Sequence, residues 1–105
     1  MESISAEGLK ELLDEGRDVA LIDVREPWEY EICRIVGSRN IPMSEIPGEL
    51  DTLEQDKDTV VICHHGMRSL QVAGFLDHAG FRRVINLDGG IDAWATRIET
   101  TMAQY

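Results

Sequence analysis

Apolar residues in this chain fall into short runs that are separated by polar and turn-forming segments. The runs are too short for helices, and their β-branched residues favour buried strands. We expect strands at residues 19–24, 40–41, 59–62 and 83–87, with Ile4 in a further short edge strand. The run from Val19 to Val24 is nearly continuous in apolar residues, as a central strand buried on both faces would be.

Amphipathic segments between these runs predict helices. Ser5 is a suitable N-cap for the first helix, which Gly16 ends. Further helices are expected at residues 28–32 and 69–79, with a helix or helical turn at residues 44–53, and a closing helix follows Gly89-Gly90. Strands that alternate with helices are typical of an α/β fold, in which helices cover both faces of a parallel sheet.

The composition is that of an ordinary globular protein. The chain has 105 residues, and we expect residues 1–105 to form a single domain with its own core. No apolar run approaches the ~18 residues of a membrane span, and the first residues lack a signal-peptide pattern. The two cysteines fit free thiols in a reducing compartment. We therefore expect a cytoplasmic protein that does not contact a membrane.

The chain is strongly acidic, with a net charge of −10. This charge argues against a nucleic-acid partner, because such proteins contact phosphates through Lys and Arg. It also repels an anionic substrate on average. Local arginines can reverse that field within a Debye length of about 8 Å, and Arg25, Arg34 and Arg68 are the candidates.

The most reactive position is Cys63, which directly follows a predicted strand and precedes a predicted helix. A cysteine placed there lies among unpaired backbone N–H groups and at the positive end of the helix dipole. Both effects favour the thiolate, which is the nucleophilic form. In α/β folds this edge of the sheet is also where ligands bind. The sequence therefore predicts an active-site loop from Cys63 to Ser69.

The chain resembles the single-domain rhodanese-like sulfurtransferases over almost its full length. Four segments match the family's signatures in the family's order, and they are Asp23-Val24-Arg25-Glu26, Arg34 to Pro42, Cys63 to Ser69, and Leu87 to Trp94. One departure is Arg34, which stands where the family often has histidine. The resemblance implies a rhodanese-like fold with a parallel sheet of about five strands, flanked by helices on both faces.

The resemblance also implies a chemistry. Cys63 would take the outer sulfur of thiosulfate or a related donor as a persulfide and pass it to a thiophilic acceptor, without a metal or organic cofactor. The acceptor would be a thiol or cyanide, and the donor a small molecule or a protein persulfide. The expected substrate-binding residues surround Cys63 in the loop, and they are His64, His65, Gly66, Met67, Arg68 and Ser69.

Within this loop, the planar guanidinium of Arg68 suits the sulfonate end of thiosulfate, and its alternative is an ion pair with an acidic neighbour. Gly66 allows a backbone conformation that a Cβ would hinder. His64 and His65 could donate hydrogen bonds to an anionic donor. Adjacent histidines rarely converge on one ion, and no second Cys/His pair has zinc-like spacing, so we expect no metal site.

Two other functions remain open at this stage. One is a phosphatase or arsenate reductase of the Cys–Arg loop design, although those enzymes have a longer loop than the four residues between Cys63 and Arg68. The other is a non-catalytic module that binds a partner or relays a persulfide. Outside the loop, Asp23 and Arg25 are expected to form a structural ion pair, with Glu26 or Glu29 as further partners of Arg25. Cys33 is expected to be a packed, inert thiol.

Overall fold

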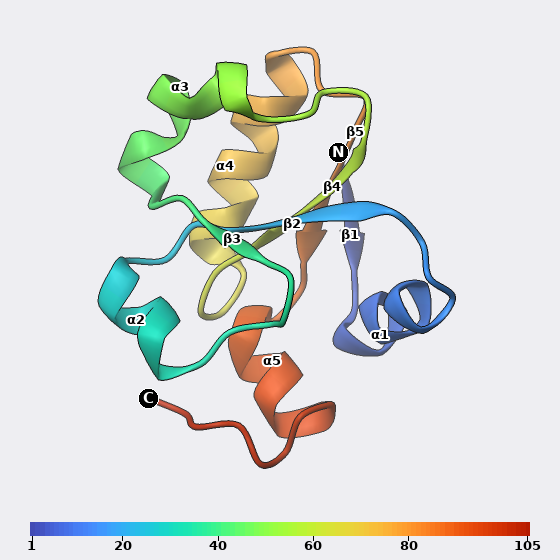
Figure 1. The fold of residues 1–105 in the computed structure, drawn as a ribbon, viewed down its shortest axis with the longest axis vertical. Helices are drawn as coiled ribbons and strands as arrows, with labels where there is room; N and C mark the ends of the chain where they lie inside the picture. The colour runs from blue at the N-terminus through green and yellow to red at the C-terminus, as the bar shows by residue number, and fades with distance from the viewer.

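The computed structural model describes residues 1–105 and contains one five-stranded, all-parallel sheet in the order β1-β5-β4-β2-β3 (Figure 1). The strands are β1 (Glu2–Ile4), β2 (Val19–Asp23), β3 (Arg39–Asn40), β4 (Asp58–Ile62) and β5 (Arg83–Leu87). The parallel sheet predicted from the sequence is confirmed, and so is the short edge strand at Ile4. The observed strand ends lie close to the predicted ones.

Helical segments connect the strands. The α-helices are α1 (Ala6–Asp14), α2 (Pro27–Ile32), α3 (Ile46–Glu49), α4 (Met67–His78) and α5 (Gly90–Arg97), and the 3-10 helices are η1 (Met43–Glu45) and η2 (Leu50–Thr52). Ser5 caps α1 as predicted, because its Oγ accepts the N–H of Gly8 at 3.0 Å. None of these helices has both the length and the apolar content needed to cross a membrane.

Two predicted helical segments have particular forms in the structure. The helix or helical turn expected over residues 44–53 forms as three short segments, η1, α3 and η2. Pro47, which lacks an N–H, and Gly48, which favours helices poorly, explain why no continuous helix forms there. The helix expected to begin at Ser69 begins at Met67 instead, because Gly66 adopts the left-handed conformation and acts as its N-cap.

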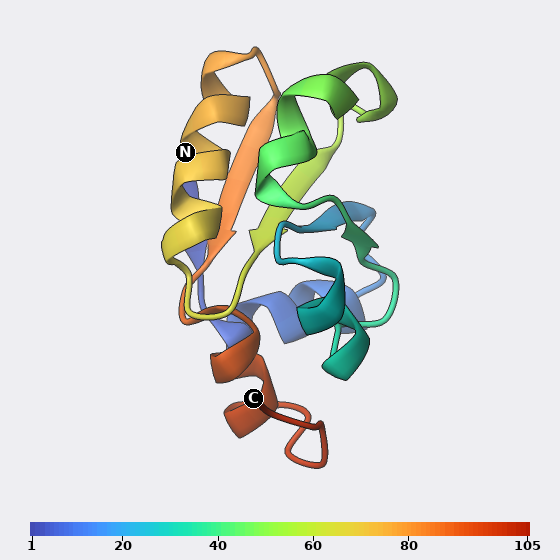
Figure 2. The same ribbon diagram turned by 90° about the vertical axis from the view of Figure 1, so that its left-hand side faces the viewer.

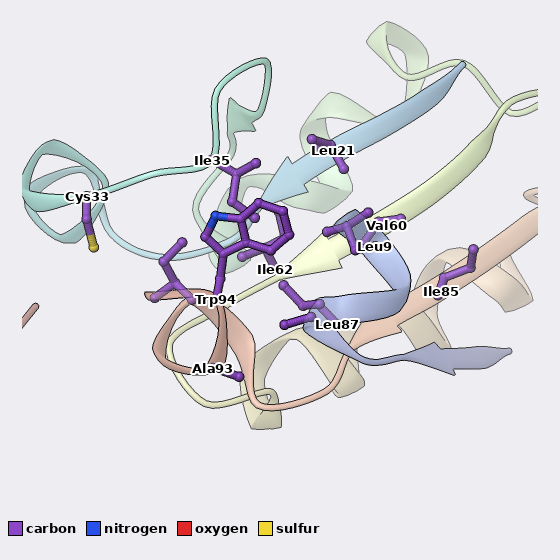
Figure 3. Close-up of a cluster of buried hydrophobic side chains, with 12 residues drawn as sticks. Leu9, Leu21, Cys33, Ile35, Val60, Ile62, Ile85, Leu87, Ala93 and Trp94 are labelled. Atoms are coloured by element: carbon purple, nitrogen blue, oxygen red, sulfur yellow. The ribbon is translucent and has the colours of Figure 1, made fainter. Parts of the chain in front are cut away.

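Side chains alternate between the two faces of the sheet and build a separate core on each. Val60 and Ile62 belong to a cluster that includes residues of α1 and α5, and Figure 3 shows the ring of Trp94 among Ile35 and Ile62. Val61 and Cys63 belong to the opposite cluster, where α4 packs along the strands (Figure 2). Cys63 therefore points to the α4 face of the sheet.

The carboxyl ends of β2 and β4 lie side by side. The N–H of Val24 donates to the carbonyl oxygen of Ile62 at 2.9 Å, which extends the pairing of these strands by one residue. The loops that follow the two strands are therefore neighbours. This brings the segment from Val24 to α2 against the loop that contains Cys63.

Candidate active site

Cys63 directly follows β4, and the residues after it form a tight loop that enters α4. Gly66 has a φ of 99°, a left-handed conformation that glycine adopts without strain. Cys63 is almost completely buried, with 1% of its surface exposed. The sulfur thus lies at the carboxyl edge of the sheet, beside the N-terminus of a twelve-residue helix. Amides and a helix dipole in that position stabilise an anion.

Two hydrogen bonds reach the sulfur. The backbone N–H of Gly66 donates to Cys63 Sγ at 3.0 Å, and the hydroxyl of Ser69 lies 3.3 Å from the same atom. Both are donors from the loop and from the first turn of α4. The structure therefore places one backbone amide and one hydroxyl next to the sulfur.

Asn86 of β5 holds this arrangement from the neighbouring strand. Its Oδ1 accepts a short hydrogen bond from Ser69 Oγ, and its Nδ2 donates to the carbonyl oxygen of Gly66 at 3.3 Å. Ser69 has a single hydroxyl hydrogen, so it can serve Asn86 or Cys63 fully, but not both at once. The Ser69 hydroxyl therefore divides its bonding between Asn86 Oδ1 and Cys63 Sγ.

The start of α5 packs directly against the loop. The N–H groups of Ile91 and Asp92 donate to the carbonyl oxygens of Cys63 and His64, at 2.8 and 3.0 Å. A Cβ on Gly90 would collide with these same two carbonyl oxygens. Only glycine permits α5 to approach the loop this closely. The contact fixes the carbonyl groups of Cys63 and His64 in the loop.

Arg68 forms a two-pronged ion pair with Glu29 of α2. Its Nη1 and Nη2 donate to Glu29 Oε1 and Oε2 at 2.7 and 2.8 Å. These bonds lower the pKa of Glu29 to about 2, even though burial opposes the shift, and they raise the pKa of Arg68. The structure thus shows the acidic pairing of Arg68 that the sequence allows, and the planar fork that was expected to hold a sulfonate is occupied by a carboxylate.

Arg25 is completely buried behind the site. Its guanidinium holds both carboxylate oxygens of Asp23, the nearest at 2.7 Å, which shows the predicted ion pair. Burial opposes the charge, but the bonds to Asp23 and to Tyr105 raise the pKa of Arg25. Glu29 contributes to Arg25 only its backbone carbonyl oxygen, at 3.3 Å, and Glu26 is not a partner. Cys33 is buried beside Arg25, in the cluster on the α1 and α5 face.

The two histidines of the loop stack face to face. Their ring centroids lie 4.0 Å apart, and the ring of Tyr105 stacks on His64 at 4.1 Å. Burial, followed by the charge of His65, lowers the pKa of His64. Ligand atoms of His64, His65 and Asp92 lie within 4.8 Å of one another. However, the lone pairs of stacked imidazoles lie in two nearly parallel planes, so they do not point to a common position.

A cavity of about 440 Å³ opens beside the loop, and it is lined by Val24, Glu26, Met43, Ser44, Pro47 and Arg68. Met67, the first residue of α4, is 72% exposed. The cavity connects the surface with the neighbourhood of Arg68, the residue that follows the loop.

Several residues of the site were not found from the sequence. Asn86 interrupts the apolar run of β5, and a polar residue at that position was the signal that could have identified it. Glu29 was considered for Arg25 but pairs with Arg68. Tyr105 contacts the loop from the segment after α5, and nothing in its local sequence predicts that contact.

Comparison with known families identifies the class of the protein. Residues 5–97 match the rhodanese-like domain, and this range includes every strand from β2 to β5 as well as the Cys63 loop. The chain therefore belongs to the rhodanese-like domain family. The resemblance seen in the sequence is confirmed.

Relatives fall into two groups by length. A sulfurtransferase of Allochromatium vinosum is 38% identical over 95 residues, with 90% of this chain and 89% of the relative covered. The thiosulfate sulfurtransferase GlpE of Pseudoalteromonas translucida is 37% identical over 84 residues, covering 80% and 79%. The "Probable adenylyltransferase/sulfurtransferase MoeZ" of Mycobacterium tuberculosis is 42% identical over 105 residues, but the chain spans only 27% of that protein.

A solved structure shows the same fold. The rhodanese-like domain protein of Staphylococcus aureus has a TM-score of 0.84 with this chain at 33% identity, and the match covers 90% of this chain and 91% of that one.

Proposed function

We propose that the protein is a sulfurtransferase that carries sulfane sulfur on Cys63. The observation that carries this proposal is the pair of donors on Cys63 Sγ, the Gly66 N–H at 3.0 Å and the Ser69 hydroxyl at 3.3 Å. The Gly66 amide is held in place before the reaction, and the Ser69 hydroxyl can turn from Asn86 to the sulfur, so both can stabilise a sulfur anion. The sulfurtransferases among the relatives support the same activity.

In the first half-reaction, the Cys63 thiolate attacks the outer sulfur of the donor. With thiosulfate, a bond forms between Cys63 Sγ and the outer sulfur, while the bond from that sulfur to the sulfonate sulfur breaks. Sulfite leaves with the electron pair, and Cys63 becomes a persulfide anion. The step is a covalent nucleophilic displacement in which no external oxidant or reductant takes part.

In the second half-reaction, a thiophilic acceptor attacks the outer sulfur of the persulfide. Cyanide would leave as thiocyanate, and a thiolate would leave as a persulfide of its own. The bond between the two sulfurs of the enzyme breaks, and the electron pair returns to Cys63 Sγ as a thiolate. The N–H of Gly66 and the hydroxyl of Ser69 again donate hydrogen bonds to the thiolate, so the site returns to its starting state.

Thiosulfate is the sulfur donor that we propose. The GlpE relative, which is named a thiosulfate sulfurtransferase, supports this choice of donor. Backbone amides of the loop would hold the anionic end of the donor, with His64 and His65 at the edge. Arg68 would contribute mainly its charge, because its fork is held by Glu29. Its position supports this role, since Arg68 lies in the first turn of α4, beside the Cys63 loop.

Intact mass measured after incubation with thiosulfate tests the proposal. We expect one added sulfur atom on the wild-type protein, located at Cys63 by peptide mapping and removed by cyanide. Cys63→Ser should neither gain the sulfur nor produce thiocyanate, because a serine hydroxyl is not ionised near neutral pH. Cys33→Ser is the matched control and should keep most of the activity, since Cys33 is buried in a core cluster.

A phosphate monoester serves as the second substrate in the same assay. Wild-type protein that hydrolysed the ester through Cys63 without forming a persulfide would overturn the proposal in favour of oxyanion chemistry. Protein that neither gained sulfur nor hydrolysed the ester would indicate a binding module instead.

A further inference from the structure

Tyr105 belongs to the active site although it lies outside the segment that matches the rhodanese-like domain, residues 5–97. The chain turns back after α5, with the N–H of Met102 bonded to the carbonyl oxygen of Glu99 at 2.9 Å. Figure 1 shows this segment returning toward α2. The turn places Tyr105 over the Cys63 loop, although the two are far apart in the sequence.

The ring of Tyr105 packs on the side chain of His64. The two centroids lie 4.1 Å apart with an interplanar angle of 23°, and His65 stacks on His64 at 4.0 Å. Two rings cannot occupy one face of an imidazole, so His64 lies between His65 and Tyr105. The edge contact between Tyr105 and Trp28, at 5.7 Å, fixes the tyrosine from the α2 side. His64 is therefore held on both faces.

The hydroxyl of Tyr105 makes the second connection. It accepts a hydrogen bond from Arg25 Nη1 at 2.9 Å and donates to Glu29 Oε2 at 2.8 Å. The same oxygen of Glu29 accepts from Arg68. One side chain thus joins the buried Arg25 to the Glu29–Arg68 pair, while its ring contacts the loop.

We propose that Tyr105 is a positioning residue that holds the Cys63 loop in its anion-binding conformation, through its ring on His64 and its hydroxyl on Glu29. It acts near both ends of the loop, since His64 directly follows Cys63, and Glu29 pairs with Arg68 in the first turn of α4. The expected effect of Tyr105 on sulfur transfer rests on the proposed function. The effect on the loop itself is independent of sulfur transfer.

Loss of the ring should loosen the loop, because one face of His64 would be left without a partner. The loop amides would then no longer be held in one arrangement, and their attraction for an anion would fall. Aromatic contacts of this kind are worth enough to change an anion preference by about five-fold. A neutral ligand would be affected much less.

Alkylation of Cys63 by two reagents of similar size measures this preference directly. Iodoacetate is an anion and iodoacetamide is neutral, and the Cys63 peptide can be quantified by mass after each. We expect Tyr105→Ala to lower the ratio of the iodoacetate rate to the iodoacetamide rate by about five-fold. Tyr105→Phe should keep most of the ratio, because it retains the ring. The KM for thiosulfate should rise in parallel in Tyr105→Ala, with a smaller change in kcat.

Tyr30→Phe is the matched control, since the Tyr30 hydroxyl donates to the carbonyl oxygen of Ser38, away from the site. A ratio in Tyr105→Ala equal to that of Tyr30→Phe and wild type would overturn the proposal, whether or not sulfur is transferred. A lowered ratio in a protein that forms no persulfide would support the positioning role and reject the sulfurtransferase assignment. The circular dichroism spectrum of Tyr105→Ala shows whether its loss reflects unfolding, and Tyr105→Phe shows how much of the loss follows from the hydroxyl alone.

Discussion

Glu29 holds both Nη atoms of Arg68, at 2.7 and 2.8 Å, across 39 residues of sequence. This pair joins α2 to the first turn of α4 at the point where the Cys63 loop ends. The carboxylate is nearly buried, with 5% of its side chain exposed, so its charge depends on the arginine. The pair therefore contributes to both the stability of the fold and the shape of the site.

The pH dependence of stability should report on Glu29. The bonds from Arg68 lower its pKa from 4.5 to about 2. A depressed pKa gives stability that is complete above the unfolded value, and that is lost as pH falls through the folded value. We expect wild type to exceed Glu29→Gln by about 3 kcal/mol near pH 7, and the difference to shrink between pH 4.5 and 2. Urea unfolding across this range measures it, and a difference that did not change with pH would contradict the prediction.

Replacement of Arg68 by lysine should separate charge from geometry. Lysine keeps the positive charge but cannot form two parallel bonds with Glu29. We expect Arg68→Lys to lose about 1 kcal/mol of unfolding free energy. It should also raise the KM for thiosulfate several-fold, because without the two-pronged pair with Glu29 the positive charge is no longer held in one position beside the loop. Denaturation and steady-state kinetics on the same preparation measure the two effects. Normal kinetics with lowered stability would show that Arg68 has only a structural role.

Gly90 should tolerate no side chain. A Cβ there would collide with the carbonyl oxygens of Cys63 and His64, so we expect Gly90→Ala to cost about 3 kcal/mol or more. Gly74 of α4 has open space around its Cβ position. Gly74→Ala should therefore stabilise the protein by about 0.5–1 kcal/mol, because alanine favours a helix. Urea unfolding measures the stability of both variants. Equal changes in the free energy of unfolding would show that α5 does not pack tightly against the loop.

Loss of the Ser69 hydroxyl should lower the rate of sulfur transfer. Ser69→Ala removes a donor to the sulfur and leaves Asn86 Oδ1 without its partner. A lost bond to a charged group predicts a decrease in kcat/KM of roughly ten-fold or more. Ser38→Ala is the control, because the Ser38 hydroxyl bonds to the carbonyl oxygen of Ile35 at 2.7 Å and to the Tyr30 hydroxyl at 3.1 Å, and neither contact involves the sulfur. Equal rates for the two variants would show that Ser69 does not stabilise the thiolate.

The parallel sheet and the Cys63 loop could be predicted from the sequence because both depend on local patterns. Apolar β-branched runs specify buried strands, and a cysteine between such a strand and a helix marks the edge where ligands bind. The capping of α1 by Ser5 is equally local, since its partner Gly8 is three residues away. Patterns of this kind need no knowledge of distant contacts.

Long-range pairings could not be predicted in the same way. Several acidic residues lie near Arg25 and Arg68 in sequence or in space, and only the packing of α2 decides that Glu29 pairs with Arg68. The start of α4 at Met67 follows from the conformation of Gly66, which depends on contacts with the segment before α5. Tyr105 reaches Arg25 across 80 residues, so no local pattern contains that contact.

The approach of Gly90 to the loop has a consequence for how the site can vary. Main-chain groups make the bonds that set the loop's shape on that side, from Ile91 and Asp92 to the carbonyl oxygens of Cys63 and His64. The side chain of Met67 projects outward and is 72% exposed. We therefore expect substitutions at Met67 to change the surface around the loop, while the main-chain bonds that shape the loop stay the same.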